Sequence, residues 1–155
     1  MIELNKEILF EINETDKLEE RYKVMFDELK FRAPNNSEID SVATALHSFY
    51  NGIEKIFEMI AAKLDKFIPQ SNRTHKELLY NAHVGNDIRP AVINRETYFI
   101  LDDYLKFRHF FRHSYSFHLR WDKMESLADN LFDTWKTVKE QLLTFVEFLE
   151  KDKLN

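Results

Sequence analysis

The segment from Phe107 to Tyr115, which reads Phe-Arg-His-Phe-Phe-Arg-His-Ser-Tyr, holds the side chains best suited to chemistry. From Lys106 to Arg120 the chain has four basic residues, three histidines and no acid, whereas its formal net charge as a whole is -5. Surface helices usually mix charge signs, because opposite charges four residues apart stabilise a helix. A segment that instead repeats like charges at Arg108 and Arg112 predicts a site for an anion, and phosphate is the obvious one.

Two residue types in this segment suffice to cut RNA. Arg108 carries a permanent planar cation that fits phosphate oxygens, and His113 accepts or donates a proton near neutral pH. A base takes the proton of the ribose 2′-hydroxyl, its oxygen attacks the adjacent phosphorus, and an acid protonates the departing 5′-oxygen. DNA lacks that hydroxyl. We therefore predict Arg108 and His113 as the catalytic pair, with His109 and Arg112 supporting the site or orienting RNA.

A helix must position these side chains. At 100° per residue, the two arginines, the histidines and Tyr115 fall on one open flank, without a carboxylate among them. The opposite arc is the expected core face and holds Tyr104, Phe107, Phe110, Phe111, Ser114 and Phe117. We expect Asn94 to cap this helix, which should continue to about His118.

Periodic apolar positions predict the other helices. We expect a first helix to about Phe31 and a second from Ser37, with Asp40 in its first turn, to Pro69. A short helix near Thr74 to Ala82 and a last helix from Asp122 to about Leu149 complete the chain. Gly52 lies inside the second helix, where a close helix crossing would explain it. The expected fold is all-α, an up-and-down bundle of four long helices plus one short helix, as a single domain over residues 1–155.

Composition agrees with this fold and excludes several classes of site. Only two Gly and three Pro occur, too few for the frequent turns of a sheet protein. The absence of Cys excludes disulfides, zinc–thiolate sites and thiol nucleophiles. No apolar run is long enough for a membrane span and the start lacks a signal-peptide pattern, so we expect a cytoplasmic protein without membrane partners. The acidic balance argues against a general nucleic-acid coating protein.

The motif resembles that of a known family. Arg108-x4-His113 is similar to the R-x4-6-H signature of HEPN-domain ribonucleases, and Tyr115 extends it to the R-x4-H-x-Y form of HepT-type toxins. The segments Asn51–Phe57 and His75–Leu79 also resemble bacterial HepT-like proteins, less specifically. The resemblance implies a HEPN-like helical bundle that cuts RNA without a metal or other cofactor. It also implies a homodimer whose two motifs meet at a shared cleft.

The same resemblance implies how the activity is controlled. HepT proteins are neutralised by a nucleotidyltransferase antitoxin, MntA, which transfers AMP from ATP onto the motif tyrosine. In this chain that residue is Tyr115. An added anionic phosphate and a bulky base beside Arg108 and His113 would compete with RNA.

The residues leave alternatives open. Five positions separate Arg108 from His113, or about 140° on a helix, so Arg112 is an equal candidate for holding the phosphate. His109 and His113 also have the spacing of two metal ligands, but no carboxylate lies nearby in sequence. A rival function is a non-catalytic HEPN-type helical module that binds a nucleotide or a protein. The other histidines read as ordinary surface or core residues: His47, His75, His83 and His118.

Overall fold

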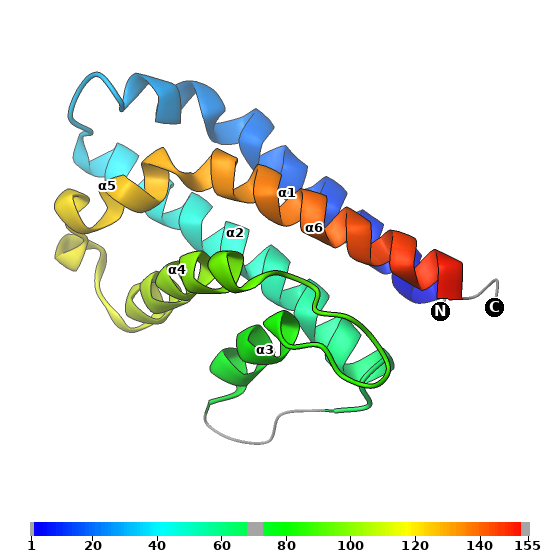
Figure 1. Cartoon of the computed structure of the whole chain (residues 1–155). Helices are drawn as coiled ribbons and strands as arrows, with labels where there is room; N and C mark the ends of the chain where they lie inside the picture. Colours follow the sequence, from blue (N-terminus) through cyan, green and yellow to red (C-terminus); the bar gives the residue numbers. More distant parts are fainter. Residues whose placement is uncertain (1, 68–72, 153–155) are drawn as a thin grey trace.

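The computed structural model describes residues 2–67 and 73–152, and within these ranges the chain is helical and has no strand (Figure 1). Its helices are α1 (Ile2–Glu28), α2 (Asn36–Lys63), α3 (Thr74–His83), α4 (Arg95–His113), α5 (Trp121–Asp129) and α6 (Leu131–Asp152), with a short 3-10 turn, η1 (Ser116–His118). The predicted all-α bundle is confirmed.

The four long helices α1, α2, α4 and α6 alternate in direction, as in an up-and-down bundle (Figure 1). Helix α2 is central and contacts α1, α3, α4 and α5, while α6 contacts α1, α4 and α5. The start of α1 and the end of α6 lie at the same end of the bundle (Figure 1).

Aromatic side chains from three helices meet at the centre of the core. The Phe49 ring of α2 lies 5.2 Å from that of Tyr104 of α4 and 6.2 Å from that of Trp135 of α6. Each of these side chains is almost fully buried, and burying a large aromatic ring is among the strongest contributions to a small core. Within the described ranges, no helix combines the length and apolar character needed to cross a membrane.

Helices α1 and α2 cross closely at Gly52, as the sequence led us to expect. A Cβ atom at this position would lie 2.7 Å from Thr15 Oγ1, which is closer than van der Waals contact allows. If the Thr15 side chain moved away, it would lose the hydrogen bond that its hydroxyl donates to the Glu11 carbonyl at 2.9 Å. Glycine therefore permits the close packing of the two helices.

The second helix begins at a different cap from the predicted one. Asn35 Oδ1 accepts from the backbone N–H of Glu38 at 2.9 Å, and Glu38 Oε1 accepts from the Asn35 N–H at 3.0 Å. This reciprocal capping box satisfies two backbone donors, so Ser37 with Asp40 was the wrong helix start. The helix also ends earlier than predicted, at Lys63, and the expected stop at Pro69 lies outside the described residues.

The last two predicted helices differ more. Helix α4 starts at the predicted Asn94 cap but ends at His113, because Ser114 is already extended. The single last helix is interrupted at Asn130, so α5 and α6 are separate. Asn130 bonds the Ser126 carbonyl through its own side chain at 2.8 Å, and this competition with the backbone favours a break.

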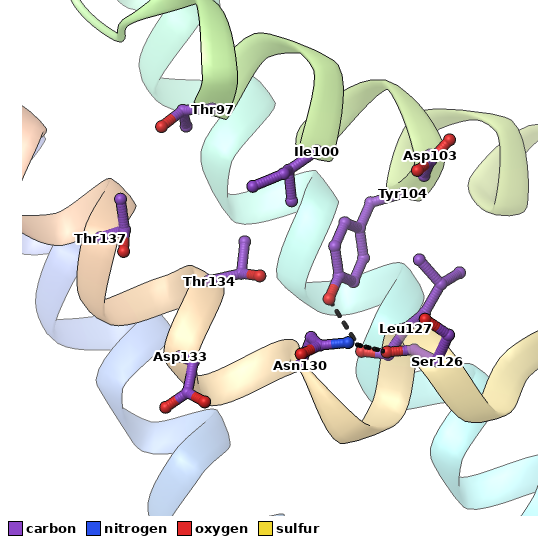
Figure 2. A pocket seen from close by; sticks show the side chains of 10 residues that line it. All are labelled: Thr97, Ile100, Asp103, Tyr104, Ser126, Leu127, Asn130, Asp133, Thr134 and Thr137. Atoms are coloured by element: carbon purple, nitrogen blue, oxygen red, sulfur yellow. Dashed lines mark hydrogen bonds between the residues drawn. The ribbon is translucent and has the colours of Figure 1, made fainter.

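A polar hollow of about 420 Å³ lies where α4 faces this break (Figure 2). The Tyr104 hydroxyl of α4 donates to the Leu127 carbonyl of α5 at 2.8 Å, and burial raises the pKa of Tyr104 to about 12. The hydroxyl therefore stays protonated and ties α4 to the α5–α6 junction. None of the motif residues lines this hollow.

Candidate functional site

Arg108 lies inside the bundle, not on the open flank of α4. Its residue exposure is 8%, and its guanidinium points toward α2. The Nε donates to Asn51 Oδ1 at 2.6 Å, and Nη2 lies 3.8 Å from Glu54 Oε1. The open-flank prediction for Arg108 is wrong because the buried arc of α4 is rotated toward Arg108: Leu105 and Arg108 are buried, whereas Phe110 of the predicted core face is exposed.

A buried carboxylate accompanies Arg108. Glu54 is 3% exposed, and its Oε1 lies 2.8 Å from Nδ1 of His75 on α3. Its other oxygen, Oε2, has no hydrogen-bond partner among the described residues. The stretch from Lys106 to Arg120 therefore has no acid in its sequence, but the spatial surroundings of Arg108 include a carboxylate. A buried carboxylate is costly to desolvate, and both Arg108 and His75 offset that cost.

The hydrogen bonds around Asn51 determine the tautomer of His47. Arginine only donates, so Asn51 must present its oxygen to Arg108 and its amide nitrogen to His47 Nε2, at 2.9 Å. His47 Nε2 therefore accepts, and the neutral ring carries its proton on Nδ1. Burial lowers the pKa of His47, and the positive charges of Arg108 and Arg112 lower it further. His47 is thus a neutral support for the Asn51–Arg108 pair.

The other motif residues lie at the exposed end of α4. His109, Arg112 and His113 are all exposed, and the two imidazole rings lie 4.7 Å apart between centroids. Among the described residues, Arg112 makes no ion pair within 4 Å, unlike Arg108. This end of α4 therefore presents one unpaired guanidinium and two imidazoles to solvent.

Arg108 and His113 do not share a pocket in one chain. Arg108 opens onto a hollow of about 480 Å³ between α1, α2 and α4. Neither His109, Arg112 nor His113 lines this hollow. Four glutamates do: Glu11, Glu14, Glu54 and Glu58. The lining sets these four carboxylates against two cations, Lys55 and Arg108, so a phosphate is disfavoured inside this hollow.

Tyr115 lies beyond the helix and not on its face. Its side chain is 70% exposed, and its ring stacks on that of Phe117 with centroids 5.1 Å apart and planes 6° apart. The prediction of one helical flank shared with Arg108 and His113 is wrong here, because Ser114 breaks the helix two residues after Arg112. Tyr115 nevertheless remains next to His113 in the chain and open to solvent.

The other candidate chemistry was a metal site at His109 and His113. Within the described ranges, no group of three or more His, Cys, Asp or Glu side chains is arranged to hold a metal ion. Among the described residues, the two imidazoles therefore have no third protein ligand.

Sequence reasoning missed the α2 and α3 side chains of the site. His47, Asn51, Glu54 and Glu58 follow one another at four, three and four residues, a polar stripe on a mostly apolar helix. Such a stripe indicates a buried polar partner on a neighbouring element, and here the partner is Arg108. Asn51 and His75 belonged to the segments of weaker family likeness, but their role at Arg108 was not foreseen.

Comparison with known proteins confirms the family resemblance. A family model described as HepT-like protein matches residues 41–149, more than half of the chain. The matched region contains α2 from its second turn, the whole motif and most of α6. No curated protein and no solved structure gave a significant match.

Proposed function

We propose that this chain, which belongs to the HepT-like family, is a metal-independent endoribonuclease toxin of a HEPN/MNT toxin–antitoxin pair. The observation that carries the proposal is the end of α4, where Arg112 and His113 are exposed directly beyond the preoriented Arg108. An otherwise acidic chain concentrates cations and imidazoles at this one place.

The proposed reaction uses one cation and proton transfer. Arg108, approached from the open end of α4 and not through the acidic hollow, holds the scissile phosphate and stabilises the charge that develops on it, while His113 acts as general base or general acid. The 2′-oxygen loses its proton and forms a bond to phosphorus, and the 5′-oxygen leaves and is protonated. The products are a 2′,3′-cyclic phosphate and a 5′-hydroxyl end. His109 and Arg112 orient the RNA.

A homodimer completes the proposed site. In one chain Arg108 faces α2, whereas His113 lies at the open end of α4, about 7.5 Å further along the helix axis. A second copy that packs its own α4 end against this one would bring an Arg and a His to one phosphate. The exposure of Arg112, His109 and His113 supports such an arrangement.

Control by modification is proposed at Tyr115. A MntA-like nucleotidyltransferase would present ATP, the Tyr115 oxygen would attack the α-phosphorus, and pyrophosphate and the phenolic proton would leave. The 70% exposure of Tyr115 supports this role. Intact-mass spectrometry after incubation with such an enzyme and ATP should show whole AMP additions that Tyr115→Phe abolishes. Additions that persist in Tyr115→Phe would place the modification elsewhere.

Cleavage of end-labelled RNA in excess EDTA tests the proposed activity. The wild-type chain should cut RNA, whereas His113→Ala and Arg108→Gln should lose about 100-fold or more of the rate. Arg108→Gln is preferred to Arg108→Ala, because a glutamine still offers a donor to the buried Glu54. His83→Ala, on α3 and away from the motif, is the matched control and should keep the rate.

The rival function is a non-catalytic module, and the internal pairing of Arg108 favours it. Asn51 and Glu54 already occupy the guanidinium, as they would in a structural role. RNA that is bound but never cut by the wild-type chain would decide for the module. Cleavage that stops in EDTA and returns with a divalent metal would instead indicate a metal-dependent hydrolase.

A further inference from the structure

A groove of about 1010 Å³ lies between α4 and the segment η1–α5, on the surface next to the motif. Phe107 and Phe110 of α4, Phe117 of η1 and Met124 and Leu127 of α5 form its apolar walls. We call it the aromatic groove. Phe107 and Phe110 flank Arg108 and His109 in sequence, so the groove runs along the same helix as the proposed catalytic residues.

The aromatic groove exposes ring faces that the core does not use. Phe110 is 43% exposed and Phe117 is 76% exposed. Phe117, which lines the groove, stacks on the neighbouring exposed ring of Tyr115. Exposed aromatic side chains gathered in one place are a common mark of a binding surface.

Cations surround these rings. Lys106, Arg120 and Lys123 line the groove, against a single acid, Asp103. Lys106 and Arg120 have neighbouring acids at 3.1 and 3.0 Å, but these pairs are exposed and therefore weak. From residue 106 to residue 123 the chain has five Lys or Arg and one acid, although its net charge is -5.

We infer that the aromatic groove binds an unpaired stretch of the RNA strand next to the scissile phosphate. This inference rests on the proposed RNA substrate and adds that the substrate must be single-stranded there. Bases of an unpaired strand stack on aromatic rings, and their phosphates contact the surrounding cations. In a duplex the base faces are stacked on one another and are not available to Phe110 and Phe117. An apolar protein segment would use the rings but leave Lys106 and Lys123 without a role.

Fluorescence anisotropy with a labelled 2′-O-methyl oligonucleotide tests the inference, because this RNA cannot be cut through its 2′-oxygen. The full-length chain should bind the single strand at least about tenfold more tightly than the same strand in a duplex. Phe110→Ala and Phe117→Ala should each weaken single-strand binding by about tenfold, since each removes one stacking ring. Lys123→Gln should weaken single-strand binding. It should also reduce the steepness of the plot of log binding constant against log salt concentration by about 0.7, since one phosphate contact is lost.

Phe31→Ala is the matched control, because Phe31 is 90% exposed and follows α1, outside the groove. It should bind as the wild type does. Equal affinity for single strand and duplex, or unchanged binding by both groove variants, would overturn the inference. So would a groove substitution that lowers the oligomeric mass in sedimentation, because a second copy would then occupy the groove.

The inference and the proposed function fail separately. Single-strand binding that depends on Phe110 and Phe117, without any RNA cleavage by the wild type, supports the groove and defeats the ribonuclease. Cleavage of single-stranded and duplex RNA at equal rates, unchanged in Phe110→Ala and Phe117→Ala, supports the ribonuclease and defeats the groove.

Discussion

At the scale of single residues, Arg108 gains a fixed orientation from side chains on two other helices. Asn51, itself held by His47, accepts from its Nε, and Glu54, itself held by His75, faces its Nη2. These contacts order the guanidinium before any ligand binds, so less side-chain conformational entropy is lost on binding. The same contacts desolvate Glu54, so removal of Arg108 would leave a buried charge poorly compensated.

The neutral state of His47 makes a pH prediction. Burial and two arginines lower the pKa of His47 in the folded chain below its usual value of about 6.5. Below pH 6.5 the unfolded chain therefore binds a proton that the folded chain does not, so stability is full above this pH and falls as the pH drops. Urea unfolding should show a smaller free energy of unfolding at pH 5.5 than at pH 7.5.

His47→Gln isolates this contribution, since glutamine accepts from Asn51 but does not titrate. The decrease between pH 7.5 and pH 5.5 should be smaller in His47→Gln than in the wild type. The same change at His83 of α3, which lies outside the Asn51–Arg108 contacts, serves as the comparison. Identical pH dependence in wild type and His47→Gln would show that His47 does not take part.

At the scale of elements, the length of α4 decides what the motif presents. The helix ends at His113, so Tyr115 belongs to the extended link before η1. Two serines flank Tyr115, and serine side chains compete with helical hydrogen bonds. The early end of α4 also allows η1 to turn back, so that Phe117 and α5 form the far wall of the aromatic groove.

The α1–α2 crossing gives a prediction at this scale. Gly52→Ala should destabilise the fold by about 1 kcal/mol, because overpacking against Thr15 outweighs the better helix propensity of alanine. Urea unfolding of the single variant measures this effect. The double variant Thr15→Ala/Gly52→Ala removes the colliding hydroxyl and should recover stability relative to Gly52→Ala. A single variant more stable than the wild type would mean that the crossing tolerates a Cβ.

At the scale of the whole molecule, one chain separates its two proposed catalytic residues. Arg108 is held toward α2, and His113 stands in solvent. A symmetric pair of chains offers each motif twice, so a site made of Arg108 from one copy and His113 from the other occurs twice per dimer. Under the proposed function, the assembly and not the single chain would be the active unit.

Mixing two inactive variants tests this arrangement. If the sites are shared between copies, a refolded mixture of Arg108→Gln and His113→Ala chains contains mixed dimers with one intact site, and about a quarter of the wild-type rate should return. Each variant alone stays inactive, and a mixture of His113→Ala with His113→Ala/Arg108→Gln is the control. No recovery in a mixture shown to contain mixed dimers would place each site within one chain.

The amino-acid sequence by itself determined the properties that depend on near neighbours along the chain. Apolar periodicity and the scarcity of Gly and Pro determined an all-α bundle, and the Asn94 cap and Gly52 crossing were read correctly. The Arg108-x4-His113-x-Tyr115 spacing led to the HepT-like family, which the match over residues 41–149 confirmed. Periodicity and short motifs are local, so they survive without knowledge of the packing.

Only the tertiary structure decided which side of each helix is covered. Helix α2 buries Arg108 and brings Asn51 and Glu54 to it, across 57 and 54 positions of chain. Packing also leaves Phe110 and Phe117 exposed, although their spacing predicted a core face. The physical reason is that a helical wheel orders the residues of one helix around its axis but contains nothing about the neighbours. The width and direction of the buried arc depend on contacts between distant segments.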